Sequence, residues 1–415
     1  MISVRNHRPL LSGNRRLIYI GIALIWAACS PKLQPVQPPV KPVEKPVVKA
    51  PEEKPPVKAL PPRVSVISLI LPFDLNYLKY GYSTPALKKA NIAVDFYQGF
   101  KLALDSLTAL GYNYKLQLFD SGDLPSESHS LAYNPQIRAS DLIVGPIFPD
   151  DIKAFTSVLT SARKPIVSPL APASPVTFNN QNLVTASPPL AYHAWATADY
   201  IAGSIKPKKI FILKSGFSEE NEYVIPFKTA IDSLGKKRIK VNQLTVVHGN
   251  LSNLVPQLSL TEQNVFIIPS TNQPFLMVTL RTLDSLGKKY PVTVFGHPSW
   301  ADFSFLKADL LQRLKTHITS SNQINYKAPA TLTFMRNYRK TYHAEPSDYA
   351  IKGFDEGLYF GRLLGEDKDG LKNLGQNNIT GMHNSFQFVK KPGQGWVNTH
   401  VNVLKYANFA LKQVK

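Results

Sequence analysis

The chain of 415 residues contains one cysteine, Cys29, so the rest of the protein can form no disulfide and no cysteine-based metal or redox centre. Recurrent catalytic signatures are also missing. The sequence has no Gly-x-Ser-x-Gly, no His-Glu-x-x-His, no glycine loop ending in Gly-Lys-Ser/Thr and no close histidine or carboxylate cluster with metal-ligand spacing. We therefore expect a protein that is not an enzyme and that uses no cofactor and no metal.

The apolar run from Leu17 to Ala28 is shorter than the roughly 20 residues needed to span a bilayer. Four arginines and no acid precede or flank it, and small Ala27 and Ala28 stand before Cys29. This pattern is typical of a cleaved signal, and it resembles a lipobox in which Trp26 replaces the usual Leu. We expect residues 1–28 to be a lipoprotein signal peptide and Cys29 to be the lipidation site.

Residues 29–62 lack the apolar content needed for a core and repeat Pro-Val-Lys and Lys-Pro-Val units. Such a composition favours extended polyproline II, which at ~3.1 Å per residue reaches up to roughly 100 Å. We interpret this segment as a semi-rigid tether. The alternative, a proline-rich ligand for an aromatic groove, stays open.

Acidic residues are few, and the formal net charge of the whole chain is +20. Residues 1–28 contain four Arg and no acid, and residues 29–62 contain six Lys and three Glu, which leaves +13 for the domain from Arg63 onward. A basic domain outside the cell attracts anionic ligands, wall or envelope phosphates, or lipid headgroups. We expect no nucleic-acid partner, because the lysines lie at scattered loop ends without interleaved aromatics.

Beyond Arg63, short β-rich apolar runs alternate with helical periodicity, which predicts an α/β fold with two parallel sheets flanked by helices. The first amphipathic helix is expected at 96–110. Strands are expected at 64–71, 114–119, 142–144 and 166–167, and in a second set at 210–213, 241–247, 265–268 and 292–295.

A Leu/Ile-Asp-Ser-Leu sequence recurs at 104–107, 231–234 and 283–286, each time at the predicted end of a helix that precedes a strand. Gly235 and Gly287 follow the last two copies and fit the position after a helix where φ becomes positive. The repeat supports a βαβ construction, although similar helix-ending signals can also arise independently.

In several segments the chain resembles the type I periplasmic binding protein superfamily, which includes extracytoplasmic receptors for branched-chain amino acids. The likeness extends over most of 64–411 and is carried by Leu71-Pro72-Phe73, Asp95-Phe96-Tyr97-Gln98-Gly99-Phe100, Asp141-Leu142-Ile143-Val144-Gly145-Pro146, Pro165-Ile166-Val167-Ser168-Pro169, Tyr338-Arg339-Lys340-Thr341-Tyr342 and 346–355.

This resemblance implies two lobes joined by three crossovers near Ala186, Gly296 and Asn384. Lobe one would comprise 63–186 with 297–385, and lobe two 187–296 with 386–415. The ligand would lie between the lobes, where the loops after the carboxyl ends of the strands provide the binding groups. Ligand-binding residues are then expected among Phe73, Gly145, Pro146, Phe148, Ser168, Ala171, Ser174, Lys214, Ser215, Ser270, His297 and Trp300.

Each of these residues also has a purely structural interpretation. Gly145-Pro146 and Ser168 could form tight turns, Phe148 and Trp300 could belong to the core, Lys214 could be a solvated surface residue and His297 could be a hydrogen-bonded hinge residue. Two departures from the amino-acid receptors leave the ligand open. Ala and Pro stand at 171–173 where those receptors have an Ala-Thr pair, and no carboxylate directly follows Phe295.

Two functions follow from the resemblance. The first is a substrate-binding lipoprotein that captures an amino-acid-like or anionic small molecule for an ABC-type permease. The second is an envelope lipoprotein that regulates a cell-wall synthase, similar to the penicillin-binding protein activators. Both imply attachment to a bacterial membrane facing the periplasm, and the outer membrane is the preferred location.

Overall fold

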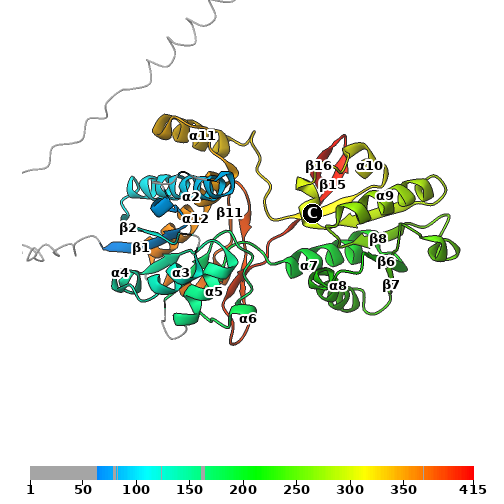
Figure 1. Ribbon diagram of the computed structural model, residues 1–415, viewed down its shortest axis with the longest axis horizontal. Helices are drawn as coiled ribbons and strands as arrows, with labels where there is room; N and C mark the ends of the chain where they lie inside the picture. Colours follow the sequence, from blue (N-terminus) through cyan, green and yellow to red (C-terminus); the bar gives the residue numbers. More distant parts are fainter. Residues whose placement is uncertain (1–62, 78–80, 82, 123, 160–163, 368) are drawn as a thin grey trace, which may run out of the picture. The chain divides into compact units, whose positions relative to one another are not determined.

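The computed structural model describes residues 63–77, 81, 83–122, 124–159, 164–367 and 369–415. The predicted signal peptide, Cys29 and the tether lie outside these ranges. Two seven-stranded sheets, A and B, organise the described chain, and a separate hairpin pairs β11 with β12. We call the parts built on sheets A and B lobe one and lobe two (Figure 1). Among the described residues, no helix is both long and apolar enough to cross a bilayer.

Sheet A has the strand order β2-β1-β3-β4-β5-β14-β13, with parallel pairing from β2 to β14 and an antiparallel edge strand β13. Its first strand is buried along most of its length, which explains its continuous run of Val, Ile and Leu. The strands are β1 (Val64–Leu71), β2 (Asn113–Asp120), β3 (Leu142–Val144), β4 (Ile166–Ser168), β5 (Leu183–Thr185), β13 (Phe388–Lys390) and β14 (Trp396–Asn398), and the hairpin consists of β11 (Ile379–Thr380) and β12 (Ser385–Phe386).

Sheet B repeats this order as β7-β6-β8-β9-β10-β15-β16, except that both β15 and β16 are antiparallel to their neighbours. The two lobes therefore share a doubly wound core of five parallel strands. The strands are β6 (Lys209–Lys214), β7 (Lys240–Thr245), β8 (Asn264–Ile268), β9 (Val292–Gly296), β10 (His317–Ser320), β15 (Asn402–Ala407) and β16 (Ala410–Gln413).

Helices cover both faces of each sheet because successive strand residues point to opposite sides. In lobe one, Leu69 packs toward α2 and α12, whereas Ile70 packs toward α5. Figure 1 shows α2 and α12 on one side of sheet A and α3 and α5 on the other. The helices are α2 (Thr84–Thr108), α3 (Pro125–Leu131), α4 (Pro135–Ala139), α5 (Pro149–Val158), α6 (Pro175–Phe178), α11 (Pro329–Tyr342) and α12 (Asp348–Glu366), with short turns η1 (Leu75–Tyr77) and η6 (Gly370–Gln376).

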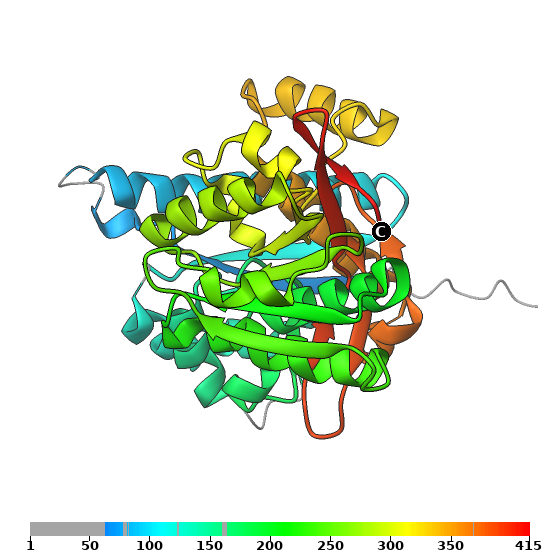
Figure 2. The ribbon, with the colours of Figure 1, turned by 90° about the vertical axis from the view of Figure 1, so that its right-hand side faces the viewer.

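In lobe two, Phe211 and Leu213 belong to the core under α9, and Ile210 and Ile212 to the core under α7 and α8. Figure 2 shows α8 and α9 on opposite sides of sheet B. The helices are α7 (Leu190–Tyr200), α8 (Asn221–Leu234), α9 (Gln273–Gly287) and α10 (Ala308–Arg313), with the π-helical turn η2 (Ile201–Ile205) and the turns η3 (Ser218–Glu220), η4 (Ser252–Gln257) and η5 (Pro298–Asp302).

Helices α2 and α12 pack backbone to backbone through glycines. A Cβ added to Gly99 would lie 1.9 Å from the carbonyl oxygen of Ala350, and one added to Gly353 would lie 2.2 Å from that of Phe96. Gly357 approaches Ala103 in the same way, at 2.8 Å. Glycine is therefore required along this interface.

The crossovers lie at 186–189, 321–328 and 399–401, between β5 and α7, β10 and α11, and β14 and β15. The expected second and third crossovers, near Gly296 and Asn384, were wrong. Strand β10 hydrogen-bonds beside β9, so 297–320 belongs to lobe two, and β13 and β14 extend sheet A, so 386–398 belongs to lobe one. Strands β10 and β14 have four and three residues and include polar side chains, so their sequences alone do not indicate strands.

Two further local expectations needed correction. The first helix begins at Thr84 rather than at Phe96, capped by the Ser83 side chain, which accepts from the N–H of Ala86. Gly235 has φ −78° and Gly287 lies inside α9, so neither takes the positive φ expected of it. Instead, Lys236 and Lys237 adopt φ values of 50° and 56°.

Candidate functional site

The carboxyl ends of β1 and β3 in lobe one, and of β6 and β8 in lobe two, flank the point where the strand order reverses. In doubly wound sheets this switch point is where ligands bind. The predicted binding residues follow these strands or their neighbours β4 and β9. Their hydrogen bonds decide which of them can reach a ligand.

In lobe one, Gly145 and Pro146 are buried and bring β3 close to β1. The N–H of Gly145 donates to the carbonyl of Val167 (2.8 Å), and a Cβ at Gly145, whose φ is +97°, would lie 2.1 Å from the carbonyl oxygen of Ile70. Phe148 is half-buried at the N-cap of α5, with the Lys89 ammonium 5.2 Å from its ring centre. At the switch point, the segment Gly145-Pro146 therefore makes close main-chain contacts with the neighbouring strands.

The predicted polar residues of lobe one mainly hold their own loop. The hydroxyl of buried Ser168 donates to the carbonyl of Ala171 (2.9 Å), which also accepts the N–H of Ala173 (2.8 Å). The carbonyl of half-buried Ser174 accepts from the N–H of Phe178 at 3.1 Å. The half-buried ring of Phe73 meets the edge of Tyr97, with their centroids 6.3 Å apart.

In lobe two, Lys214 is 9% exposed, and its Nζ donates to the side-chain oxygen of Asn221 at the start of α8 (2.8 Å). It is therefore neither a solvated surface lysine nor turned into open space. Asn221 thus accepts from one of the three N–H donors of this ammonium group.

A buried carboxylate organises the neighbouring loop. Glu220 accepts from the N–H of Ser215 (3.0 Å), from its hydroxyl (2.6 Å) and from the N–H of Gly216 (3.4 Å). The Ser270 hydroxyl donates to that of Ser215 (3.2 Å) and accepts from the N–H of Asn272 (3.2 Å). The backbone donors at the end of β6 are thus already paired with a carboxylate of the protein itself.

His297 and Trp300 follow β9. Trp300 is 1% exposed and donates from its indole N–H to the carbonyl of Ser270 (3.0 Å), so it is a core residue that fixes the β8 loop. His297 accepts the N–H of Ser299 at Nδ1 (3.1 Å), which places the proton of its neutral ring on Nε2. Burial lowers the pKa of His297 to about 4, so this ring is neutral at physiological pH.

These groups border a pocket of about 340 Å³ built entirely from lobe two. Of the residues predicted for a cleft between the lobes, Ser270 and His297 line this pocket, whereas the acidic residues around the start of α8 and the first residue of α7 were not predicted. The only sequence signal for the former was the acid-rich stretch after Phe217. The lining residues are Leu190, Phe217, Glu219, Glu220, Glu222, Tyr223, Pro269, Ser270, Thr271, Asn272 and His297.

The wall behind the pocket is uncharged. The ring of Tyr223 lies 6.4 Å from that of His297, and its hydroxyl donates to Thr197 (2.7 Å), while burial raises its pKa. His193 is hydrogen-bonded to Thr319 (3.0 Å), and burial together with His297 lowers its pKa to about 3. A ligand here would meet an uncharged wall and an acidic rim.

A larger cavity of about 1230 Å³ lies against α11, α12 and the β11–β12 hairpin, and residues of the crossovers that follow β10 and β14 also line it. Two pairs of its polar side chains are hydrogen-bonded to each other, whereas Gln323 Oε1 and Thr331 Oγ1 are buried without a partner among the described residues. Asp355 accepts from the N–H of His383 (2.8 Å) and contacts its Nδ1 (2.6 Å), and Asn384 is bonded to His400 (2.8 Å). None of the predicted ligand residues lines it.

This arrangement is the fold of the type I periplasmic binding proteins. An ABC-type branched-chain amino acid transporter protein from Rhodopseudomonas palustris superposes with a TM-score of 0.59 at 14% identity, covering 84% of this chain and 95% of its own. A substrate-binding protein from Desulfitobacterium hafniense in complex with Leu gives 0.54 at 16% identity, covering 85% and 100%.

The C-terminal domain of LpoA from Haemophilus influenzae, a regulator of PBP1A, gives a TM-score of 0.57 at 12% identity, covering 85% of this chain and 100% of that domain. No protein-family profile and no curated protein matches the sequence. At these identities the comparisons establish the fold, which proteins of ABC transporters share with a regulator of PBP1A.

Proposed function

We propose that this protein is a non-enzymatic, extracytoplasmic lipoprotein that captures a small molecule as a substrate-binding protein of an ABC-type transporter. The observation that carries the proposal is the lobe-two pocket at the switch point, where Ser270 and the Nε2–H of His297 border a neutral wall. Its volume of about 340 Å³ falls within the range of about 300–1,000 Å³ typical of small-ligand sites.

Of the two ligand classes expected from the sequence, an amino-acid-like molecule fits this pocket better than a simple anion. Glu219 and Glu222 are among the lining residues, which include no lysine or arginine, and Lys214 at the end of β6 is bonded to Asn221. Carboxylates attract an ammonium group and repel an anion. The backbone donors that would otherwise suit an anion are taken by Glu220.

Native mass spectrometry of the protein released gently from its host tests this function. A co-purified small molecule is the expected result, and His297→Gln should reduce its retention, whereas His129→Gln on the exposed face of α3 should not. Protein that is reproducibly empty and gains no thermal stability from any amine-bearing metabolite would contradict the proposal.

A second candidate is an envelope regulator of a cell-wall synthase. It is favoured by the internal pairing of Ser168, Lys214 and Ser215, which leaves few free polar groups at the strand ends. An empty protein that pulls down a cell-wall synthase would support it. In either case, Cys29→Ala should prevent lipid attachment, so that a high-salt wash releases the protein from the membrane fraction.

A further inference from the structure

Lobe two is electrically polarised along its parallel strands. The five turns that enter β6 to β10, at 206–209, 235–240, 259–263, 287–291 and 314–316, hold ten basic residues and one acid. The carboxyl-end turns at 214–222 and 296–302 hold one lysine and four acids. We call the first set the basic turns.

The fold itself does not require this basicity, because lobe one has the same strand order without it. In the described turns entering β1 to β5, Arg63 lies 3.8 Å from Asp141, and Lys164 donates to the carbonyl of Ser140 (2.7 Å). Among the described residues, unpaired cations are concentrated at this end in lobe two and not in lobe one.

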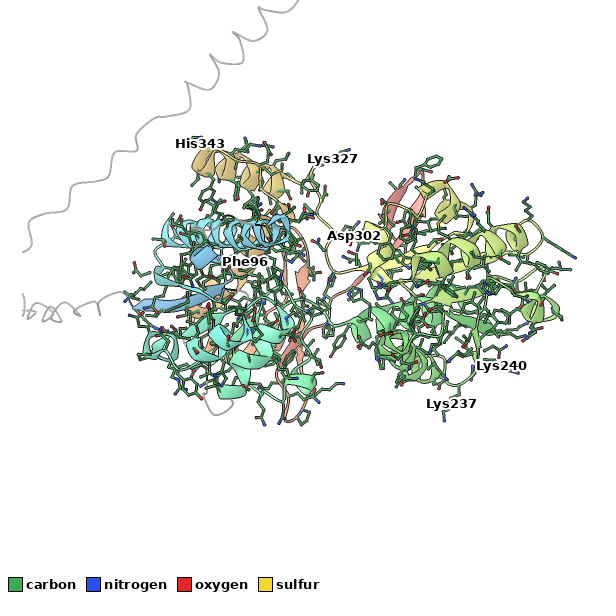
Figure 3. All side chains as sticks on the ribbon, in the orientation of Figure 1. Phe96, Lys237, Lys240, Asp302, Lys327 and His343 are labelled. Carbon is green, nitrogen blue, oxygen red and sulfur yellow. The ribbon has the colours of Figure 1, made fainter. Side chains whose placement is uncertain are left out.

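Most charges of the basic turns are not neutralised. Within the part of the chain that the structure describes, Lys208 is the one member of the ten with an ion pair, to Glu262 at 2.7 Å. Lys237 and Lys240 extend away from the ribbon of lobe two (Figure 3). Adjacent turns are held together by the backbone, since the N–H of Lys240 donates to the carbonyl of Lys208 (2.9 Å).

Four of these lysines occupy backbone positions that suit glycine. Lys206, Lys236, Lys237 and Lys315 have φ values of 53°, 50°, 56° and 47°. Side chains with a Cβ rarely adopt this left-handed region, and Gly or Asn is the usual residue there. The repeated choice of lysine at strained positions indicates a use for the positive charge.

We propose that the basic turns form a docking surface for a membrane that carries anionic phospholipids. Lysines are mobile point charges without the rigid fork of arginine, and they are spread over several turns, so they match a repeating negative surface rather than one shaped anion. The lipidation signal at Cys29 and the 34 residues up to Arg63 would keep the domain within reach of such a surface.

The test uses the full chain carrying Cys29→Ser, so that attached lipid cannot contribute. Phosphatidylcholine vesicles containing phosphatidylglycerol should bind it, with an affinity that falls as salt rises, and pure phosphatidylcholine vesicles should not. The double variant Lys236→Gly/Lys237→Gly should bind about tenfold more weakly or worse. Its thermal stability should be unchanged or higher, because glycine suits both φ values.

The matched control is Lys327→Gln/Lys340→Gln, which removes the same charge from exposed positions in the crossover before α11 and on α11 itself, and which should bind like the parent. Equal weakening of both pairs would overturn the proposal in favour of net charge alone. Undiminished binding of the glycine variant would also overturn it, as would tighter binding to soluble inorganic polyphosphate than to the vesicles. None of these outcomes depends on the pocket beside His297.

Discussion

Glu220 holds Ser215 through two groups at once, accepting both its backbone N–H (3.0 Å) and its hydroxyl (2.6 Å). The carboxylate is 5% exposed and belongs to the turn that leads into α8. It therefore fixes the shape of the loop after β6 and occupies donors that could otherwise serve a bound anion.

We expect Glu220→Ala to destabilise the protein by about 2 kcal/mol, because it removes the charged acceptor of the N–H and hydroxyl of half-buried Ser215 and of the N–H of Gly216. Thermal or urea unfolding measures the loss. Glu222→Ala, at an exposed position on the same helix start, should change stability by less than about 0.5 kcal/mol. Similar losses of stability in the two variants would show that the hydrogen bonds of Glu220 contribute no more to stability than exposed Glu222 does.

Gly145→Ala should cost about 2–5 kcal/mol, since the new methyl group would collide with the carbonyl of Ile70 at a positive φ. Gly393→Ala is the control for backbone strain alone, because Gly393 also has a positive φ (+75°) but open space around it. Its expected cost is about 1 kcal/mol. An equal fall of the denaturant midpoint in the two variants would argue against a close approach of Gly145 to the carbonyl of Ile70.

The fold was largely predictable, because buried parallel strands are continuous runs of Val, Ile and Leu. Strands 64–71 and 142–144 were expected at their observed bounds. What failed was the division of the lobes. The short strands β10 and β14, His-Ile-Thr-Ser and Trp-Val-Asn, are recognisable only from the neighbours with which they pair.

For the candidate site, the sequence indicated loops but not the bonds that their side chains make. The switch-point rule selected the loops containing Ser270 and His297, and both residues line the pocket of lobe two. It could not reveal that Lys214 turns to Asn221 or that Glu220 covers the amides of Ser215 and Gly216, because those bonds depend on side-chain directions set by the fold.

Acid should destabilise lobe two through its buried histidines. Burial lowers the pKa of His193 to about 3 and those of His297 and His317 to about 4. Below about pH 6.5 these histidines bind protons in the unfolded chain but stay neutral in the folded protein. The free energy of unfolding therefore falls as the pH drops toward about 4.

Urea midpoints measured across this pH range should show that slope. It should become shallower in His193→Gln, which removes one of the buried rings, and should stay the same in His129→Gln. An unchanged slope in the His193 variant would mean that this ring titrates normally in the folded protein.

Glu356 should act in the opposite direction. It is 1% exposed on α12, and burial raises its pKa well above the usual value, with nearby Lys352 as a partial counterweight. Above about pH 4.3 the unfolded chain releases this proton more readily than the folded one, so the group lowers stability as pH rises.

Glu356→Gln should therefore raise stability near pH 7 by about 1 kcal/mol or more, while leaving it little changed near pH 4. Calorimetry at the two pH values checks this, with exposed Glu219→Gln as the control. A glutamine variant that is less stable at neutral pH would indicate a charged carboxylate bound to Lys352.

The glycine contacts between α2 and α12 have a mechanical consequence. With Gly99 against Ala350 and Gly353 against Phe96, a slide of either helix along the other would drive one main chain into the next. These contacts prevent α2 and α12 from sliding past each other, so lobe one moves as a rigid body. A rearrangement that accompanies ligand capture or release is then a hinge motion at the three crossovers, 186–189, 321–328 and 399–401.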